Sequence, residues 1–242
     1  MTETELLYLK DSYTKSCDAI IQEVIIDSGK CFVVLDRTVF YAQGGGQVYD
    51  TGKIIDKHNK EYNVTSVKKQ NGRILHEVDK LGLNYDESIK CEIDWNRRYK
   101  LMRSHTATHI LAETIFRETG SLITGNNIDT DKCRIDFDLE KNDPELIKKS
   151  IDNSNNVIKQ NLPVKIELMP REEAFKIPQL SKLAKGLPES LKEIRVVSIG
   201  DYDIQADGGM HVKNTIEIGK IEFIKVDNRG KNNRRIYFKI VD

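Results

Sequence analysis

The chain has 242 residues, enough for one large domain or for two smaller domains that each bury a core. Lysine and arginine together number 38, as do aspartate and glutamate, so the zero formal charge excludes a uniformly basic nucleic-acid binder. The chain shows neither a long apolar run nor a signal peptide, so we expect no membrane partner. Its four cysteines are scattered, without CxxC spacing, which is typical of reduced thiols in a cytoplasmic protein.

The first 96 residues are predicted to form a small β-barrel domain. Short runs of β-branched and apolar residues, such as 19–28 and 30–37, are divided by glycine and asparagine turns. Asn71-Gly72 is a dipeptide preferred in two-residue hairpins. Many short strands joined in this way indicate a barrel.

Residues 97–242 are predicted to form an α+β domain. Residues 97–118 contain no glycine or proline and have helical spacing of apolar side chains, and Gly120 is a helix-end signal. A second helix is expected at 144–160, with Asp143 as its N-cap. Strands are expected at 132–139, 164–169, 194–198, 218–226 and 235–241. The whole chain is therefore assigned to the α+β class.

Two connections in this second domain are also predicted. Residues 171–187 form a polar segment that is expected to contain a short helix. Residues 227–230, with the sequence Asp-Asn-Arg-Gly, are expected to form the hairpin between the last two strands.

Two segments far apart in the sequence carry three of the five histidines. His105 and His109 are one helical turn apart and share a face with Thr108. Asp207 and His211 flank two glycines, which permit a sharp turn or a close approach. Zinc accepts imidazole nitrogen and carboxylate oxygen, so the four side chains are a candidate metal site. Two histidines at this spacing are also common at exposed or capping positions.

A third candidate is the glycine-rich loop Gly44-Gly45-Gly46-Gln47. Its simplest interpretation is a flexible hairpin loop, and its functional interpretation is a set of backbone N–H groups that bind a phosphate or carboxylate. No Gly-Lys-Ser/Thr follows, so it is not a nucleotide-binding P-loop. Likewise Thr106 excludes the HExxH metalloprotease motif, because threonine cannot be its general base.

Basic residues cluster in two places. Such clusters are usually solvated faces, but they are the natural phosphate contacts if the partner is RNA. The residues are Arg97, Arg98, Lys100 and Arg103, and Lys225, Arg229, Lys231, Arg234 and Arg235.

These motifs, in this order, resemble those of the AlaX family of freestanding alanyl-tRNA editing proteins and of the editing domain of alanyl-tRNA synthetase. Arg37–Gly52 is similar to the family's glycine-rich barrel motif, Arg103–Glu113 to its first zinc motif and Asp203–Gly219 to its second. Asp131–Phe137 is similar to the strand that follows the first zinc motif. The N-terminal barrel without a long C-terminal extension is similar to the medium-sized AlaX class.

The resemblance implies a zinc-dependent trans-editing hydrolase that deacylates mischarged Ser-tRNA(Ala), and possibly Gly-tRNA(Ala), in the cytoplasm and without ATP. It implies that Thr108 recognises the serine hydroxyl and that Gly44, Gly45, Gly46 and Gln47 bind substrate. The implied zinc ligands are His105, His109, His211 and Asp207.

The second zinc motif departs from the family's usual Cys-Gly-Gly-Thr-His, because Asp207 and Met210 replace the cysteine and the threonine. Asp207 is then either a zinc ligand or a group that orients a ligating imidazole. Two rival functions remain: a non-catalytic tRNA-binding module with a structural zinc, and the related threonyl-tRNA synthetase editing domain. The glycine-rich motif favours the alanyl type over the threonyl type, and the sequence predicts no oligomeric state.

Overall fold

The computed structural model describes residues 3–140, 143–181 and 191–242 and divides into two compact units, Met1–Leu101 and Met102–Asp242. The division falls inside helix α1 (Trp95–Thr119), slightly beyond the boundary expected after residue 96. The predicted α+β class and N-terminal barrel are confirmed. Within the described residues, no helix is both long and apolar enough to cross a membrane.

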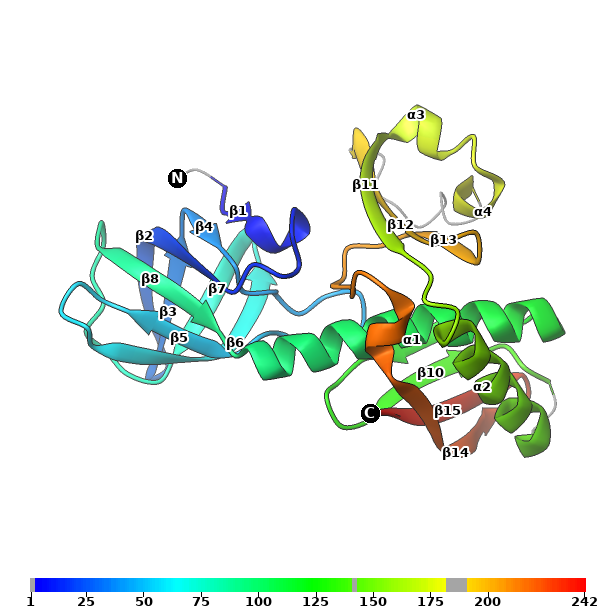
Figure 1. Ribbon diagram of the computed structural model, residues 1–242. Helices are drawn as coiled ribbons and strands as arrows, with labels where there is room; N and C mark the ends of the chain where they lie inside the picture. Colours follow the sequence, from blue (N-terminus) through cyan, green and yellow to red (C-terminus); the bar gives the residue numbers. More distant parts are fainter. Residues whose placement is uncertain (1–2, 141–142, 182–190) are drawn as a thin grey trace. The chain divides into compact units, whose positions relative to one another are not determined.

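The first unit is built on a closed antiparallel barrel, coloured from blue to blue-green in Figure 1. Its interior is filled by fully buried aliphatic side chains such as Ile21, Val33 and Leu35. A short parallel pair, β1 (Glu5–Leu6) with β4 (Arg37–Thr38), flanks the 3₁₀ turn η1 (Leu7–Leu9). The barrel strands follow the order β2 (Ser16–Asp27), β3 (Lys30–Leu35), β7 (Arg73–Val78), β6 (Glu61–Gln70), β5 (Gly52–Ile55) and β8 (Ser88–Ile93).

Two barrel hairpins turn on residues with left-handed backbone. Asn71 and Gly72, which join β6 to β7, have φ of 51° and 77°. Ser28 and Gly29, which join β2 to β3, have φ of 50° and 81°. Two consecutive positive φ angles match the right-handed twist of the flanking strands. The hairpin predicted at Asn71-Gly72 is confirmed.

Helix α1 is the long helix that carries the first histidine motif. It is capped by Asp94, whose Oδ1 accepts from Arg97 N at 3.1 Å, and it ends before Gly120, which has φ of 75°. Its middle is buried almost all round, so its hydroxyls need partners. Thr106 and Thr108 meet this need by donating to the carbonyls four residues earlier, at 3.0 and 2.8 Å.

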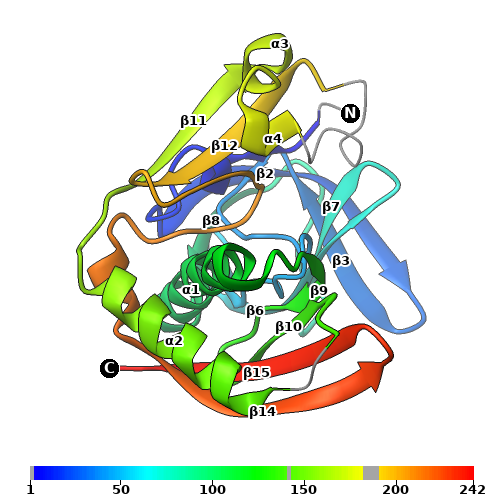
Figure 2. The same ribbon diagram turned by 90° about the vertical axis from the view of Figure 1, so that its right-hand side faces the viewer.

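The second unit contains a four-stranded sheet with α1 and α2 (Pro144–Ile158) on one face, as Figures 1 and 2 show. Asn155 fixes α2 to the sheet, because its Nδ2 donates to Ile221 O at 2.9 Å and its Oδ1 accepts from Ile221 N at 2.8 Å. Asp143 caps α2 as predicted, by accepting from Glu145 N and Leu146 N. The strands follow the order β14 (Lys220–Gly230), β15 (Asn233–Val241), β10 (Cys133–Phe137) and β9 (Ile123–Asn127).

A three-stranded antiparallel sheet in the same unit delivers the second histidine motif. Its strands are β11 (Val164–Pro170), β12 (Glu193–Ile199) and β13 (Asp203–Ala206). The short helices α3 (Arg171–Ala174) and α4 (Pro178–Ser181) share a small apolar core with it. Asp207 directly follows β13, and the 3₁₀ turn η3 (Thr215–Ile218) lies just beyond His211.

The structure of the second unit differs from the sequence-based expectations in two respects. The hairpin predicted between the last two strands is confirmed, but its turn lies at Lys231 and Asn232 rather than at 227–230, because β14 continues through those residues. Strands β9 and β13 were not predicted, since the short segments Ile-Thr-Gly-Asn-Asn and Asp-Ile-Gln-Ala have little apolar alternation. Of the connection expected at 171–187, residues 182–187 lie outside the described residues.

Candidate metal centre

Four side chains from two distant segments converge in the second unit. His105 and His109 come from α1, and Asp207 and His211 from the loop after β13. Their ligand atoms all lie within 4.8 Å of one another, and the three ring centroids are 4.6 to 5.3 Å apart. The three histidines are buried, while Asp207 keeps 17% of its side chain exposed. The structure therefore brings together all four predicted metal ligands.

The outward-facing nitrogens of two of these rings have protein partners. His109 Nδ1 lies 3.0 Å from Asp203 Oδ2. His211 Nδ1 lies 3.2 Å from Thr106 Oγ1, whose own proton goes to Met102 O. Both Nδ1 atoms therefore act as donors, which leaves each Nε2 as the lone-pair atom. This is the arrangement by which outer partners fix the ring and tautomer of a metal-binding histidine.

Asp207 lies on the inner side of the cluster. Its Oδ2 is 3.0 Å from His211 Nε2, and its Oδ1 is 3.5 Å from His105 Nε2. Its backbone is also held, because Arg195 Nη1 donates to Asp207 O at 2.7 Å. The carboxylate thus faces the Nε2 atoms that would bind a metal, whereas the outer positions on His109 and His211 belong to Asp203 and Thr106.

The second glycine of the motif is required by close packing. A Cβ added at Gly209 would lie 1.9 Å from His105 Cε1 and 2.2 Å from His105 Nδ1. Gly209 N also donates to Asp207 Oδ2 at 2.6 Å, which fixes the carboxylate. At Gly208 an added Cβ would meet nothing within 4 Å. Glycine is therefore required for close packing at position 209 but not at position 208.

The protonation states of His211 and Asp207 suit a cation. Burial lowers the pKa of His211 to about 3, so its imidazole is neutral near pH 7. Burial would raise the pKa of Asp207, but the neighbouring His105 and His211 outweigh it and hold that pKa well below its usual range. His109 differs, because its bond to Asp203 outweighs burial and raises its pKa, toward the protonated form whose proton a bound cation would displace. A neutral imidazole and an ionised carboxylate are the forms that bind metal.

The donor set fits a zinc-like ion. Three imidazole nitrogens and one carboxylate oxygen suit zinc, whereas calcium and magnesium prefer oxygen-only ligands. Ligand atoms around a tetrahedral zinc lie about 3.4 Å apart, and the Asp207–His211 and Asp207–His105 separations of 3.0 and 3.5 Å bracket that value.

The other predicted site residues fall in both units. Thr108 is 2% exposed, lies one residue before His109 on α1, and donates its hydroxyl proton to Ser104 O.

The loop Gly44–Gln47 belongs to the first unit. Gly45 and Gly46 have φ of 57° and 83°, and Gly44 and Gln47 exchange backbone hydrogen bonds of 3.2 and 2.9 Å. The loop is thus a tight turn with exposed glycines and a buried Gln47.

Four of the basic residues proposed as phosphate contacts bond to other groups of the chain. Arg98 is completely buried and pairs with Asp50 at 2.5 Å. Arg103 donates to Ile218 O, Arg234 is 5% exposed, and Arg235 pairs with Asp136. These contacts support the fold, and for the buried Arg98 and Arg234 they contradict the expected role as phosphate contacts.

Sequence reasoning missed Asp203 and Thr106 as partners of the histidines. Asp203 gives no local signal, because its proximity to His109 depends on how β13 lies against α1. Thr106 carries a weak signal, because it is a polar residue between the two candidate histidines on a part of the helix that is otherwise buried.

Two known families match parts of the chain. Residues 9–97 match the family described as tRNA synthetases class II (A). Residues 194–237 match the threonyl and alanyl tRNA synthetase second additional domain. The second match includes Asp207 and His211.

Proteins similar over the full length give a sharper comparison. The alanyl-tRNA editing protein AlaX-M of Methanosarcina barkeri is 46% identical, with 99% of this chain and 100% of that protein covered. The AlaX-M protein of Saccharolobus solfataricus is 44% identical, with 98% and 99% covered. The alanine–tRNA ligase of Saccharolobus islandicus is 38% identical over 93% of this chain, which corresponds to 25% of that larger protein.

Proposed function

Because this chain belongs to the AlaX-M family of alanyl-tRNA editing proteins, we propose that it is a zinc-dependent deacylase of Ser-tRNA(Ala) and, secondarily, of Gly-tRNA(Ala). The family places it among the trans-editing hydrolases of mischarged tRNA(Ala). The observation that carries the finer proposal is the convergence of His105, His109, Asp207 and His211. The reaction hydrolyses the ester between the amino acid and the terminal ribose.

We propose zinc as the metal and Asp207 as its fourth protein ligand. The support is the position of the Asp207 carboxylate beside the inner Nε2 atoms of His105 and His211. An outer role for Asp207 is disfavoured because Asp203 and Thr106 already occupy the Nδ1 atoms of His109 and His211. Replacing the family's usual cysteine by aspartate keeps one negative ligand in the site.

Bound zinc would supply a positive charge that polarises the ester carbonyl or favours ionisation of water. The protein's own contribution is to hold three imidazoles within a largely water-excluded cluster, two of them, His109 and His211, in a fixed tautomer. Asp203 and Thr106 keep the protons of His109 and His211 on the outer nitrogens. The reacting centre is thereby organised before the substrate arrives.

We propose that Thr108 selects the amino acid. Its proton is committed to Ser104 O at 2.8 Å, so its oxygen can accept a hydrogen bond from the serine hydroxyl. A buried group that accepts such a bond is left unpaired by alanine, and sites of this kind reject the analogue by roughly 10⁴–10⁵. The helical spacing of Thr108 relative to His105 and His109 supports this role.

The remaining roles follow from the family. We propose that residues 97–242 form the zinc-binding editing domain and that residues 1–96 form a barrel domain whose Gly44–Gln47 turn binds the acceptor end of tRNA(Ala). The exposed Gly44, Gly45 and Gly46 support contact with a substrate. We propose that the protein acts in the cytoplasm, without ATP.

The deciding experiment measures the release of labelled serine from Ser-tRNA(Ala), beside Ala-tRNA(Ala), before and after chelation. We expect rapid release of serine, sparing of alanine, loss of activity on chelation, and recovery with zinc. A protein that retains zinc and binds tRNA without releasing serine would instead be a non-catalytic tRNA-binding module.

Thr108→Val and Thr108→Ser test the selectivity separately. Valine removes the hydroxyl, and we expect it to reduce Ser-tRNA(Ala) deacylation by about 100-fold or more while zinc content stays normal. Serine keeps the hydroxyl and should retain most of the activity. Equal activity of the valine variant and the parent would assign Thr108 to packing alone.

A further inference from the structure

Asp203, the partner of a candidate metal ligand, is the first residue of a short strand. Among the described strands, β13 forms an edge of its three-stranded sheet. Side chains alternate between the two faces of a strand, so Ile204 and Ala206, which pack on the apolar core beside α3 and α4, point away from Asp203. Gln205 Nε2 donates to Asp203 Oδ1 at 3.1 Å, but Gln205 belongs to the same strand. The distance from Asp203 to His109 therefore depends on how the hairpin is held against α1.

The residue directly before Asp203 holds the hairpin on α1. Tyr202 ends the turn between β12 and β13, and its hydroxyl lies 2.7 Å from Thr114 Oγ1. Its carbonyl oxygen accepts from Arg117 Nη2 at 2.5 Å. The Arg117 guanidinium also covers its ring, with Cζ 4.3 Å from the ring centre, which is a favourable cation–π distance. Tyr202 is thus attached to α1 at two places by three contacts.

The direction of the hydroxyl bond follows from the neighbouring groups. Thr114 is 3% exposed and donates its only side-chain proton to Ile110 O at 2.7 Å. The Tyr202 hydroxyl is therefore the donor, and Thr114 Oγ1 is the acceptor. Ser154 Oγ of α2 lies 2.9 Å from the same oxygen, so this contact joins α1, α2 and the hairpin. A buried acceptor with defined donors fixes the position of the tyrosine ring.

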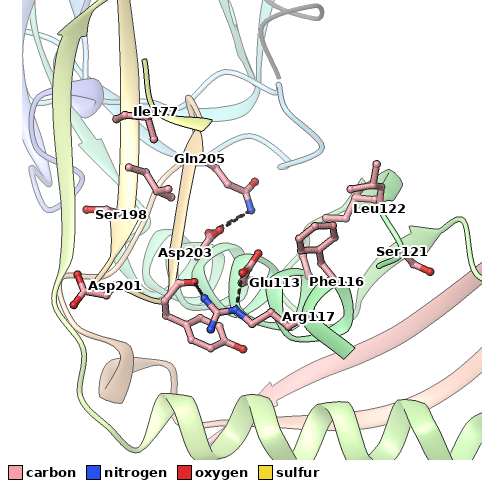
Figure 3. Close-up of a pocket in the computed structure, with 15 residues that line it drawn as sticks. Glu113, Phe116, Arg117, Ser121, Leu122, Ile177, Ser198, Asp201, Asp203 and Gln205 are labelled. Carbon is pink, nitrogen blue, oxygen red and sulfur yellow. Dashed lines mark hydrogen bonds and ion pairs between the residues drawn. The ribbon is translucent and has the colours of Figure 1, made fainter. Parts of the chain in front are cut away.

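Arg117 is itself fixed on the helix. Its Nε lies 2.6 Å from Glu113 Oε1, a bond that Figure 3 shows between the two labelled side chains. Glu113 is four residues after His109 and therefore lies on the same helix face. This ion pair directs the other end of the guanidinium toward the Tyr202 carbonyl.

Two consecutive residues of the hairpin are thus bound to one helix. Asp203 bonds to His109, and Tyr202 bonds to Thr114, five residues further along α1. These two points are about 7.5 Å apart along the helix axis. Because the helix continues unbroken between them, a displacement of Tyr202 changes the distance from Asp203 to His109. Metal sites keep their affinity only when ligands are held to within roughly 0.5 Å.

We propose that Tyr202 is a positioning residue of the metal centre. Its bonds to Thr114 and Arg117 set the place of Asp203, and Asp203 in turn orients His109 toward the metal. Tyr202 itself contacts none of the four candidate ligands in this role. The proposal rests on the proposed zinc-dependent function.

The first test compares zinc affinities by competition with a chromophoric chelator. Tyr202→Leu removes the hydroxyl and the ring, and we expect a 10- to 100-fold loss of affinity, as for loss of an outer partner. Tyr202→Phe keeps the ring beneath Arg117 and should lose about 2- to 10-fold, the range for one hydrogen bond. Tyr237→Leu is the matched control, because Lys132 and Lys225 lie over that ring elsewhere in the second unit. It should bind zinc as the parent does.

The acceptor of the hydroxyl bond gives an independent check. Thr114→Val removes the acceptor and should lower zinc affinity as Tyr202→Phe does. Thr114→Ser keeps a hydroxyl at this position and should restore the affinity of the parent. Equal zinc affinities in Thr114→Val, Thr114→Ser and the parent would contradict the proposal.

A double-mutant cycle separates positioning from a general loss of stability. If Tyr202 acts through Asp203, Tyr202→Leu should cause no further loss of zinc affinity in a protein that already carries Asp203→Ala. A merely structural role would cause the same loss in both backgrounds. Additive losses would therefore overturn the proposal, as would unchanged affinity in folded Tyr202→Leu.

The proposed function and the role of Tyr202 fail in different ways. If the parent binds zinc but releases no serine, the deacylase function fails, while the affinity measurements still decide the role of Tyr202. If the parent binds zinc and releases serine but the Tyr202 variants keep its affinity, the deacylase function stands and the positioning role is refuted. A parent that binds no zinc would refute both.

Discussion

The buried histidines of the two units have opposite surroundings. In the barrel, His76 uses both ring nitrogens: Nδ1 lies 3.1 Å from Val33 O and Nε2 lies 2.8 Å from Thr38 Oγ1. In the second unit, His109 and His211 use Nδ1 for Asp203 and Thr106, and their Nε2 atoms lie in a cluster with Asp207. A histidine whose two ring nitrogens both have hydrogen-bond partners supports the fold. A histidine that uses only Nδ1 in this way keeps Nε2 for a ligand.

The strongest test of this contrast removes a metal-binding ring. His211→Ala should lose bound zinc and reduce Ser-tRNA(Ala) deacylation by about 10³-fold or more, because the metal contributes several kcal/mol. Metal analysis by mass spectrometry and the serine-release assay measure both effects. His58→Ala changes an exposed histidine and should match the parent. Full activity in His211→Ala would show that the cluster is not the reacting centre.

Crowding the cluster should have the next largest effect. Gly209→Ala places a Cβ against the His105 ring, and we expect about a 100-fold loss of zinc affinity because the ring must move. Gly208→Ala is the matched control, since its Cβ meets nothing within 4 Å. Competition with a chromophoric chelator gives both affinities. Equal affinities would mean that His105 does not need its present position.

Removing an outer partner should be milder. Asp203→Ala leaves His109 Nδ1 without its acceptor, and we expect zinc affinity to fall 10- to 100-fold. Asp201→Ala, at an exposed carboxylate two residues earlier, should leave the affinity unchanged. Competition with the same chromophoric chelator measures the zinc affinity of both variants. If Asp203→Ala binds zinc normally, Asp203 does not orient His109.

The barrel histidine should affect the stability of the fold and its dependence on pH, rather than zinc binding. Burial lowers the pKa of His76 from 6.5 to about 4, so the unfolded chain takes up this proton first as the pH falls. His76 then contributes stability that is complete above pH 6.5 and is lost between 6.5 and about 4, by about 3 kcal/mol in total.

Denaturant titrations followed by the fluorescence of Trp95 measure this effect, because the single tryptophan lies in the first unit. His76→Gln should be less stable at pH 7 and should lose less stability on acidification. His58→Gln should keep the slope of the parent. An unchanged acid slope in His76→Gln would show that His76 is not held neutral.

The histidine motifs were found from the sequence because their spacing is local. His105 and His109 share a helix face by periodicity, and the glycine pair before His211 indicated a close approach that the packing of Gly209 on His105 now explains. The turn residues of the barrel and the Asp143 cap could likewise be predicted from the sequence, because each feature depends only on the conformation of the neighbouring backbone. The turn of the last hairpin lies at Lys231 and Asn232 rather than at 227–230, because strand pairing outweighed local turn preference.

The sequence by itself determined the α+β class, the barrel, the family motifs and the identity of the four candidate ligands. The tertiary structure alone decided which histidine nitrogens point inward, that Asp203 and Thr106 hold the outer ones, and that Arg98 is an internal ion pair rather than a surface charge. The physical reason is that periodicity and turn chemistry act over a few residues. The partners of a buried polar group instead come from wherever packing brings another element, 94 residues away for His109 and Asp203.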